Sequence, residues 1–420
     1  MPRAPYTILV LYCLDPQRSR LAFLRGLTFF LKEHAPEHNY VYHNARYDSP
    51  TAIAKTDFDA IILDVTFLAL RWNTESEFAR ILKDYEFVKA SQAVKIALPQ
   101  DEYDCNEILD NWLTDWQIDT LFSVISSHHE ILYPKYHRTG QIELGYTGYV
   151  PEQLIDTVTP AFGDRPIDIG YRAQKLPAYF GRLGLNKWQI GEKIAAISTK
   201  YGLKTDIVIG PHGTLYAQEW YNFIANCKFT LGANSGSSLL DPRGEIQRAI
   251  RAYESKHGQR EFSELESLFF PGQDGLHNFT ALSPRVIEAA LLRSCQILVK
   301  GEYSGIVKPW IHYIPLEPDG SNFEAIVDFM RDGQKVERMI EDCRSEILGR
   351  PELRFASKAR RILECIDQNP RTMTASLRQK RLPGKFFYDR RKKLEFRSRG
   401  PFTQLQFIAL RLINKLGWTI

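Results

Sequence analysis

Short apolar runs of strand length alternate with helix-length amphipathic stretches, and this alternation occurs twice along the 420 residues. In the first half, the runs of strand length are residues 7–12 (TILVLY), 59–65, 94–98 and 119–125. The stretches of helical periodicity that separate them are residues 20–34, 75–89 and 106–116. Strands separated by helices of this length pair in parallel, because a parallel connection needs a crossover. The first half therefore predicts an α/β layer around a parallel sheet.

A second series of the same kind follows a linker-like stretch that ends at Gly163-Asp164-Arg165-Pro166. Its strand-length runs are residues 167–171, 206–210, 228–231 and 296–299, and its helical stretches are 187–201, 218–226 and 284–293. A chain of 420 residues exceeds what one hydrophobic core supports. We therefore expect two Rossmann-like α/β/α domains, residues 1–160 and 166–370, facing each other across a cleft at the carboxyl ends of their strands.

Positive charge is concentrated in a basic C-terminal tail, residues 371–420. These residues hold 13 Lys and Arg against two acids, about +11, so the rest of the chain carries about −7. Aromatic residues interleave the basic ones, and an apolar helical stripe runs from Leu405 to Leu416. Two interpretations stand: a terminal helix that packs on the body, or an anchor on an anionic membrane surface through residues 380–420. Since the tail contains no known recognition module, we expect no nucleic acid partner.

The cysteines and the hydropathy pattern predict a cytoplasmic protein. None of the six cysteines lies within four residues of another, which excludes zinc or redox spacing of the CxxC type. No run of about 18 apolar residues suggests a membrane-spanning helix, and the short apolar run near the start lacks a cleavage site. If the tail is an anchor, the protein would be peripheral on the inner face of the cell membrane.

The most informative stretch for function is residues 282–322. Ser283 is a good helix N-cap, Pro284 suits the first helical position, and a short helix would follow. The amino end of that helix favours a phosphate, and Arg285 adds a fork-shaped cation there. Glu288 lies one turn further along, where its carboxylate could accept from two ribose hydroxyls. This order of groups predicts a nucleotide diphosphate site.

This stretch resembles the nucleotide-sugar site of GT-B glycosyltransferases, above all bacterial glycosyltransferase-like proteins related to glycosyl transferases group 1. The matching motifs are SPR at 283–285, EA at 288–289, GEYSG at 301–305, HYIPL at 312–316, and SN at 321–322, with DIGYR at 168–172, GRLG at 181–184, Lys187 and LGANSGSSLLD at 231–241. The resemblance covers most of residues 166–330 and, weakly, residues 99–103. It implies the GT-B fold and a nucleotide-diphosphate sugar as donor substrate, with no cofactor.

The resemblance also implies which residues bind the donor. The candidates are Arg172, Arg182, Lys187, Ser235, Gly236, Ser283, Arg285, Glu288, Tyr303, Ser304, Gly305 and His312. Three departures from the family pattern bear on them. Thr280 stands where retaining members often carry a second glutamate, and Asn234 stands where close relatives have an acid. Pro177 precedes the GRLG motif without a strand, so Arg172 is an alternative phosphate partner to Arg182.

A catalytic base is expected from the first domain. Inverting transfer needs a group that takes the acceptor hydroxyl proton. Asp15 follows the first strand, and Asp101 and Glu102 follow the strand at 94–98, at carboxyl ends where such groups belong. The acids at 101–104 do not have metal-ligand spacing, and helix dipoles with cations can stabilise a leaving diphosphate, so no metal is required. We interpret the adjacent His128 and His129 as exposed or hydrogen-bonding residues rather than metal ligands.

These features predict a metal-independent glycosyltransferase for hexosyl or pentosyl transfer. It would move a sugar to a glycan or a lipid-linked acceptor in surface polysaccharide synthesis. Two alternatives stay open: a non-catalytic GT-B-like binding protein, and a nucleotide-sugar epimerase or hydrolase.

Overall fold

The computed structural model describes residues 5–15, 22–216 and 218–371, and its chain forms two compact units. The first unit comprises residues up to 123, residues 129–145 and the segment from 355 onward. The second comprises Val124–His128 and Tyr146–Arg354. The basic tail predicted for residues 371–420 lies, beyond Arg371, outside the described residues.

The first unit is built on a six-stranded sheet in the order β2-β1-β3-β4-β5-β6, with every pair parallel. Its strands are β1 (Thr7–Tyr12), β2 (Asn39–Asn44), β3 (Ala60–Leu63), β4 (Val94–Ala97), β5 (Thr120–Ser123) and β6 (Gln141–Leu144). The parallel sheet predicted from the alternation is confirmed. Strands β2 and β6 were not predicted, because neither is a continuous apolar run. Strand β2 reads NYVYHN, and the side chains of β6 are not buried.

Helices surround this sheet in the expected order along the chain. They are α1 (Ala22–His34), α2 (Val65–Leu68), α3 (Glu75–Asp84), α4 (Glu86–Ala90), α5 (Asn106–Asp115), α6 (His129–Leu132) and α14 (Phe355–Gln368). The helix predicted for residues 75–89 is two helices, which meet at Tyr85. Tyr85 is 4% exposed and its hydroxyl bonds His43 Nε2 at 2.8 Å, so its side chain is drawn into the core.

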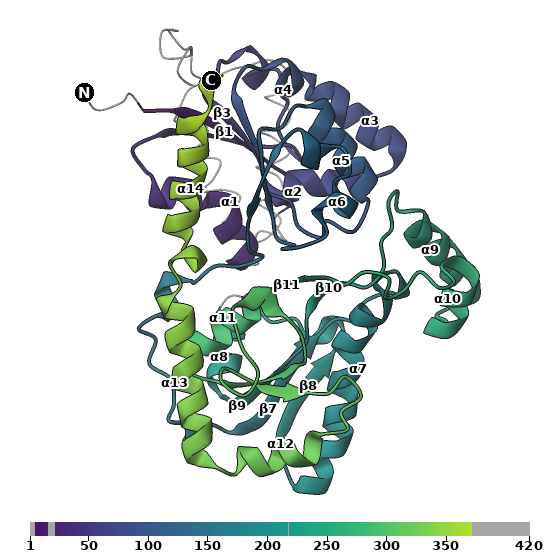
Figure 1. The fold of residues 1–420 in the computed structure, drawn as a ribbon, viewed down its shortest axis with the longest axis vertical. Coiled ribbons are helices and arrows are strands. Elements are labelled where there is room, and N and C mark those ends of the chain that lie inside the picture. The colour runs from purple at the N-terminus through teal and green to yellow at the C-terminus, as the bar shows by residue number, and fades with distance from the viewer. Residues whose placement is uncertain (1–4, 16–21, 217, 372–420) are drawn as a thin grey trace, which may run out of the picture. The chain divides into compact units, whose positions relative to one another are not determined.

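Helix α14 belongs to the first unit although it comes last in the described chain. Its apolar face, with Ile362 and Ile366, joins the core formed by β1, β3, β4 and α1. Phe355 stacks on Phe30 of α1 with ring centroids 5.8 Å apart. This packing differs from the domain boundary expected at residue 370: the chain returns to the first unit at residue 355. Figure 1 shows α14 following α13 and running beside α1.

The second unit contains a five-stranded parallel sheet in the order β13-β12-β9-β7-β8. Its strands are β7 (Ile167–Ala173), β8 (Thr205–Ile209), β9 (Cys227–Gly232), β12 (Cys295–Val299) and β13 (Ile314–Leu316). Helices α7 (Gly181–Ser198), α12 (Phe323–Met330) and α13 (Gly333–Gly349) share one core with these strands. Helices α8 (Gln218–Ala225) and α11 (Pro284–Leu291) pack against each other and against β9.

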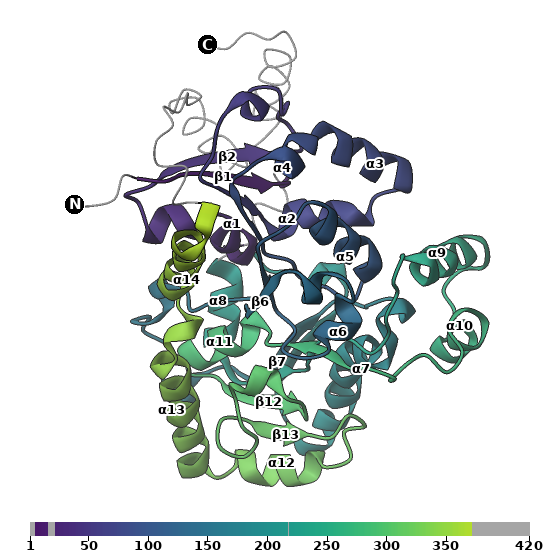
Figure 2. The same cartoon turned by 45° about the horizontal axis from the view of Figure 1, so that its top comes forward.

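An insertion separates β9 from α11. Strands β10 (Ser235–Ser237) and β11 (Phe279–Ala281) pair in an antiparallel ribbon, and helices α9 (Glu245–His257) and α10 (Phe262–Phe269) lie between them in sequence. Figures 1 and 2 both show α9 and α10 standing out from the rest of the second unit. Their apolar residues Ile250, Leu265 and Phe270 form a small cluster with Tyr179, which lies just before α7. Among the described residues, no helix combines the length and apolar character that a membrane crossing needs.

Candidate functional site

The strand order of the second sheet creates a switch point beside β7. The chain leaves β7 for β8 on one side, and the next strand, β9, pairs with β7 on the other side. Helices that depart in opposite directions leave a crevice at the carboxyl ends of such strands, and ligands of open α/β sheets bind there. The second unit therefore offers a binding position between the ends of β7 and β9.

A pocket of about 930 Å³ opens at this edge of the sheet. Its walls come from the start of α7, the ends of β9 and β12, the base of the insertion and the segment before α6. Its described lining includes Arg182, Asn234, Asp274, His277, Gly301 and Glu302. All of these residues belong to the second unit. The volume is in the range of small-molecule sites.

Asn234 places an unpartnered polar atom in the pocket wall. The residue follows β9 and is 8% exposed. Its Nδ2 donates to the Lys300 carbonyl at 3.3 Å, whereas its Oδ1 is buried without a partner among the described residues. A buried acceptor without a partner costs free energy, and a ligand hydroxyl can supply the missing bond. Asn234 thus keeps one unused acceptor in the wall of the pocket.

Gly301 is required for Asn234 to lie where it does. A Cβ on Gly301 would come 1.9 Å from Asn234 Nδ2 and 2.5 Å from its Oδ1. The loop after β12 therefore passes directly over the amide, and a larger residue would displace it. The first glycine of the GEYSG motif therefore lets the loop pass close to the Asn234 amide.

The amino end of α7 is already occupied by side chains from the insertion. Asp274 Oδ1 accepts from the Arg182 amide at 3.0 Å, and Ser238 Oγ accepts from the Leu183 amide at 3.1 Å. The predicted helix start at residue 187 was six residues late: α7 begins at Gly181, where φ is +68°. Glycine adopts this backbone conformation readily, so GRLG is the helix start itself.

Arg182 lines the pocket, but its guanidinium is engaged. Its Nε lies 3.1 Å from Asp274 Oδ2, and its NH2 nitrogen lies 2.5 Å from Glu266 Oε2. The guanidinium also covers the Phe262 ring at 4.9 Å. The predicted phosphate ligand therefore pairs, in this structure, with two carboxylates of the insertion.

A second group of predicted residues gathers at the start of α11. Ser283 is its N-cap residue, with extended backbone and no side-chain cap bond, and Pro284 occupies the first turn as predicted. The Arg285 guanidinium carbon lies 5.2 Å from the ring centroids of both Tyr171 and Trp220. Arg285 Nε is buried without a partner among the described residues. These contacts hold a cation over the end of β7.

Glu288 is a buried carboxylate with one defined partner. It is 8% exposed, and its Oε2 accepts from Trp220 Nε1 at 2.8 Å. Burial raises the pKa of the Glu288 carboxyl, while the Trp220 bond and the nearby Arg285 act in the opposite direction. Neither Glu288 nor Arg285 lines the 930 Å³ pocket.

Lys187 and Tyr171 connect these two groups. Lys187 Nζ lies 3.5 Å from Ser235 Oγ at the start of β10. The Tyr171 hydroxyl donates to the Lys187 carbonyl at 2.5 Å, and the Tyr171 ring faces Arg285. Ser235 begins β10, which pairs with β11, and β11 leads directly into α11. The structure therefore brings Lys187, Ser235, Arg285 and Glu288 into one connected region of the second unit.

The remaining predicted loop residues have structural contacts. Tyr303 is fully buried and its hydroxyl donates to the Val299 carbonyl at 2.6 Å. Ser304 Oγ accepts from the Leu282 amide at 3.1 Å, and Gly305, with φ +70°, closes the turn. Gly236 has φ +135°, and a Cβ there would meet the Phe279 carbonyl oxygen at 1.8 Å. These four positions shape the loops and the ribbon.

Arg172 is turned away from the pocket. Its NH2 nitrogen pairs with Asp206 Oδ2 at 2.8 Å, its NH1 nitrogen donates to the Asp206 carbonyl, and its guanidinium lies 3.9 Å from the Phe223 ring. Arg172 therefore ties β7 to β8 and α8. The alternative in which Arg172 replaces Arg182 as phosphate partner finds no geometric support.

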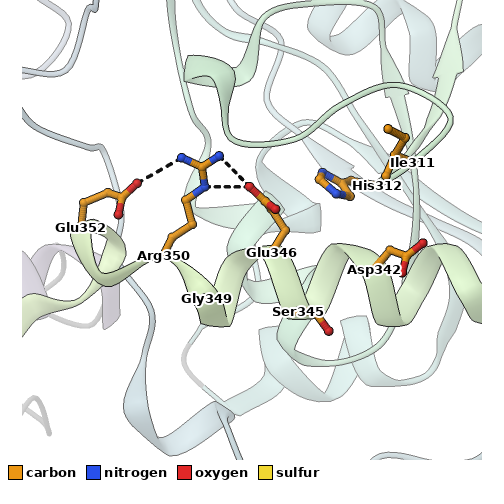
Figure 3. Close-up of a pocket in the computed structure, with 8 residues that line it drawn as sticks. All are labelled: Ile311, His312, Asp342, Ser345, Glu346, Gly349, Arg350 and Glu352. Atoms are coloured by element: carbon orange, nitrogen blue, oxygen red, sulfur yellow. Dashed lines mark hydrogen bonds and ion pairs between the residues drawn. The ribbon is translucent and has the colours of Figure 1, made fainter.

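His312 lines a different pocket, of about 610 Å³, together with residues of α13 (Figure 3). Its Nδ1 accepts from the Lys308 amide at 3.2 Å, and it is 6% exposed. Burial lowers the pKa of its imidazole, against the raising effect of Glu346 and Asp342. In Figure 3 the Arg350 guanidinium lies between Glu346 and Glu352, pairing with both. His312 thus does not join the donor candidates.

The three predicted catalytic acids occupy different environments of the first unit. Asp15 is half-buried just after β1. Asp101 is exposed in a left-handed turn with φ +48°, and its Oδ1 accepts from the Tyr103 hydroxyl at 2.7 Å. Glu102 is fully buried and accepts from the Ser123 hydroxyl at 2.6 Å and from the Tyr133 hydroxyl. In this position the Glu102 side chain has no exposed surface.

Sequence reasoning missed several residues of the site. His128, interpreted as exposed or hydrogen-bonding, lines the 930 Å³ pocket, and its ring lies 5.5 Å from that of His277. Asp274 and Trp220 also went unnoticed. His128 could have been predicted as a site residue, because it follows the end of a predicted strand. Asp274 and Trp220 could not have been predicted, because both act through tertiary contacts with residues about 70 to 90 positions away.

The sequence matches no protein-family model and no curated protein sequence. Similar solved structures are glycosyltransferases. An α-glucosyltransferase with UDP and a 13-mer DNA containing an A:G mismatch has a TM-score of 0.53 at 10% identity, covering 86% of this chain and 100% of its own. Anabaena HepE in complex with UDP-glucose has a TM-score of 0.50 at 10% identity, covering 87% of this chain and 100% of its own. These matches confirm the predicted GT-B fold with two Rossmann-like units.

Proposed function

We propose that the protein is a glycosyltransferase that moves a sugar from a UDP-sugar to a glycan or a lipid-linked acceptor in surface polysaccharide synthesis. The observation that carries the proposal is the pocket at the switch point of the second sheet, with the unpartnered Asn234 Oδ1 in its wall. Two observations support UDP as the nucleotide: similar solved structures hold UDP or UDP-glucose, and their fold is the same. A nucleotide sugar has both the hydroxyls and the charge that such a site binds.

The donor's parts would meet different side chains. Arg285 and Lys187 would neutralise the diphosphate, helped by the amide groups at the starts of α7 and α11. Glu288, oriented by Trp220, would accept from ribose hydroxyls, and Asn234 would accept from a sugar hydroxyl. These fixed charges and dipoles can stabilise a leaving diphosphate by themselves, so the proposed mechanism assigns no step to a metal.

His128, Asp101 and Asp15 are the candidates for the group that takes the acceptor's proton. His128 lines the donor pocket, and imidazole is the most frequent general base in enzymes. Asp101 and Asp15 follow strands of the first unit and are its rivals. Replacing each residue in turn separates them: loss of the base lowers kcat by about 10²-fold or more and leaves UDP affinity intact.

Transfer is tested by incubating the protein with UDP-glucose and other UDP-sugars, with and without acceptors, and measuring release of UDP and glycosylated product. The acceptor panel includes glycans, lipid-linked glycans and duplex DNA, because one similar structure contains DNA. We expect product only when an acceptor of the glycan or lipid-linked class is present. UDP release that is independent of acceptor supports a hydrolase instead, and binding without turnover supports a binding protein.

The proposed cytoplasmic site of action rests on the cysteine spacing and the hydropathy of the sequence. The proposed membrane association rests on the charge and the apolar stripe of the tail, whose residues 380–420 lie outside the described residues. Vesicles that contain an anionic lipid should retain the full chain, and deletion of residues 400–420 should release it. Retention of the deleted chain would contradict the anchor.

A further inference from the structure

Asp274 is one of several contacts that hold the insertion carrying α9 and α10 against the start of α7, beside the Arg182–Glu266 ion pair and the apolar packing around Tyr179. Asp274 lies at the carboxyl-terminal base of the insertion, and its side chain is 3% exposed. Its Oδ1 accepts from the Arg182 amide at 3.0 Å and from the Ser238 hydroxyl at 2.7 Å, and its Oδ2 faces Arg182 Nε at 3.1 Å. A helix amide, a hydroxyl and a guanidinium thus converge on this carboxylate.

These are the groups that ordinarily bind phosphate oxygens in proteins. An 18-residue helix presents its unpaired amides and its positive dipole end at this point, and an arginine adds a charged fork. Asp274 fills that position with an anion supplied by the chain itself. Gly181 makes the approach possible, because a Cβ there would come within 2.3 Å of both Asp274 Oδ1 and Ser238 Oγ.

A second, independent observation indicates that a ligand enters the same pocket. Asn234 lines it together with Arg182 and Asp274, is 8% exposed, and keeps its Oδ1 without a partner among the described residues. Asp274 does not reach this atom in any described contact. The pocket therefore contains an unpartnered acceptor, Asn234 Oδ1, and an anion-binding position at the start of α7 that the Asp274 carboxylate occupies.

The local charge balance at the start of α7 disfavours a diphosphate while Asp274 stays in place. Arg182 contributes one positive charge, and it pairs with both Asp274 and Glu266. A diphosphate brought to this helix end would meet a net negative charge at short range. Removal of Asp274 from the helix end would reverse that balance and free the Arg182 Nε group.

We infer that Asp274 is an internal stand-in for the donor diphosphate, which displaces it from the start of α7 and thereby loosens the carboxyl-terminal base of the α9–α10 insertion. The inference rests on the proposed function in naming a UDP-sugar, but the competition itself requires only a diphosphate. Donor binding is then coupled to movement of the insertion, whose base forms one wall of the pocket.

The variant Asp274→Asn tests this competition. Asparagine keeps the shape and can still accept from Ser238, but it removes the negative charge. Asp241→Asn is the matched control: Asp241 is also a buried carboxylate of the insertion, 4% exposed, and it caps α9 through the Gln247 amide at 2.8 Å without lining the pocket. Dissociation constants for UDP and for inorganic pyrophosphate are measured by calorimetry on the full-length proteins.

We expect Asp274→Asn to bind both probes about tenfold more tightly than the wild type, since one like charge near the phosphates is lost. Asp241→Asn should leave both constants unchanged. In the double variant Arg182→Ala with Asp274→Asn, the gain should disappear, because Arg182 is the group that Asp274 releases. Equal or weaker binding by Asp274→Asn, or a gain that persists without Arg182, would overturn the inference.

Hydrogen exchange of the wild-type protein gives a readout that does not depend on any variant folding well. Saturating UDP or pyrophosphate should accelerate amide exchange in residues 262–278, and slower or unchanged exchange there would contradict the displacement. Wild-type protein that binds pyrophosphate but not UDP would overturn the proposed donor and leave this inference standing. Failure of both wild type and Asp274→Asn to bind pyrophosphate would show that α7 offers no anion site, and the inference would be wrong.

Discussion

The indole Nε1 of Trp220, in the first turn of helix α8, donates to Oε2 of Glu288, in the middle of helix α11, at 2.8 Å. The same indole ring lies 5.2 Å from the Arg285 guanidinium carbon. A single side chain thus contacts both the cation and the carboxylate that we assign to the nucleotide. Trp220 is 68 residues away from Glu288, so this arrangement exists only in the folded chain.

Replacing Trp220 with Phe should weaken UDP binding by about five- to tenfold. Phenylalanine keeps an aromatic ring near Arg285 but leaves the buried carboxylate without its donor, a loss of about 1–3 kcal/mol. Calorimetric titration with UDP measures the effect. Trp188→Phe is the control, because Trp188 Nε1 has no partner among the described residues. Equal affinities of the two variants would contradict the assigned role of Trp220.

UDP affinity should rise with pH through the titration of Glu288. Burial raises the pKa of this carboxyl above the ordinary value of 4.5, so it stays protonated to a higher pH than an exposed glutamate. A protonated carboxyl is a poorer acceptor for ribose hydroxyls, and affinity therefore falls as the pH drops through the raised pKa. Glu288→Gln should abolish this acid-side dependence. A profile that is the same in wild type and Glu288→Gln would exclude Glu288 as the titrating group.

Gly301→Ala should weaken UDP-sugar binding by about tenfold. The added Cβ collides with the Asn234 amide, and steric overpacking of this kind costs about 1–3 kcal/mol or displaces the side chain. Binding of UDP-glucose is the measurement. Gly163→Ala serves as the control, since nothing lies within 4 Å of the Cβ it would gain. If both variants bind as the wild type does, Asn234 has no part in the site.

Much of the fold followed from local patterns, whereas much of the site did not. The β1, β4 and β12 strands are fully buried and mostly apolar, so hydropathy located them, and Ser283-Pro284 marked the start of α11. The insertion was not predicted, because its two helices bury only a few apolar side chains, in a small cluster with Tyr179. Arg172 and Arg182 looked equivalent in sequence. Only tertiary partners, Asp206 for the first and Asp274 and Glu266 for the second, distinguish them.

Stability of the first unit should increase with pH above about 8 because of Lys358. This α14 lysine is 8% exposed, and burial lowers its pKa from 10.5 to about 8, with Asp64 acting in the opposite direction. Between these values the unfolded chain binds more protons than the folded one, so the free energy of unfolding rises with pH, by on the order of 1 kcal/mol per unit. Urea unfolding at pH 7.5, 8.5 and 9.5 measures this slope.

Lys358→Met should flatten that slope by removing the titrating group, and it should stabilise the protein most at the lower pH. Lys335→Met is the control, since the Lys335 side chain on α13 is 67% exposed. A slope that survives in Lys358→Met would assign the pH dependence to other groups, such as Lys95, whose pKa burial also lowers to about 8.

The central claim is that the pocket beside Asn234 in the second unit binds a UDP-sugar, and calorimetric titration with UDP and UDP-glucose tests it most directly. We predict saturable binding of one ligand per chain, weakened about tenfold or more by Asn234→Ala and by Arg285→Ala. Arg172→Ala, which removes a cation that pairs with Asp206 away from the pocket, should leave the affinity unchanged. Absence of binding to both ligands, or binding that only Arg172→Ala weakens, would contradict the account.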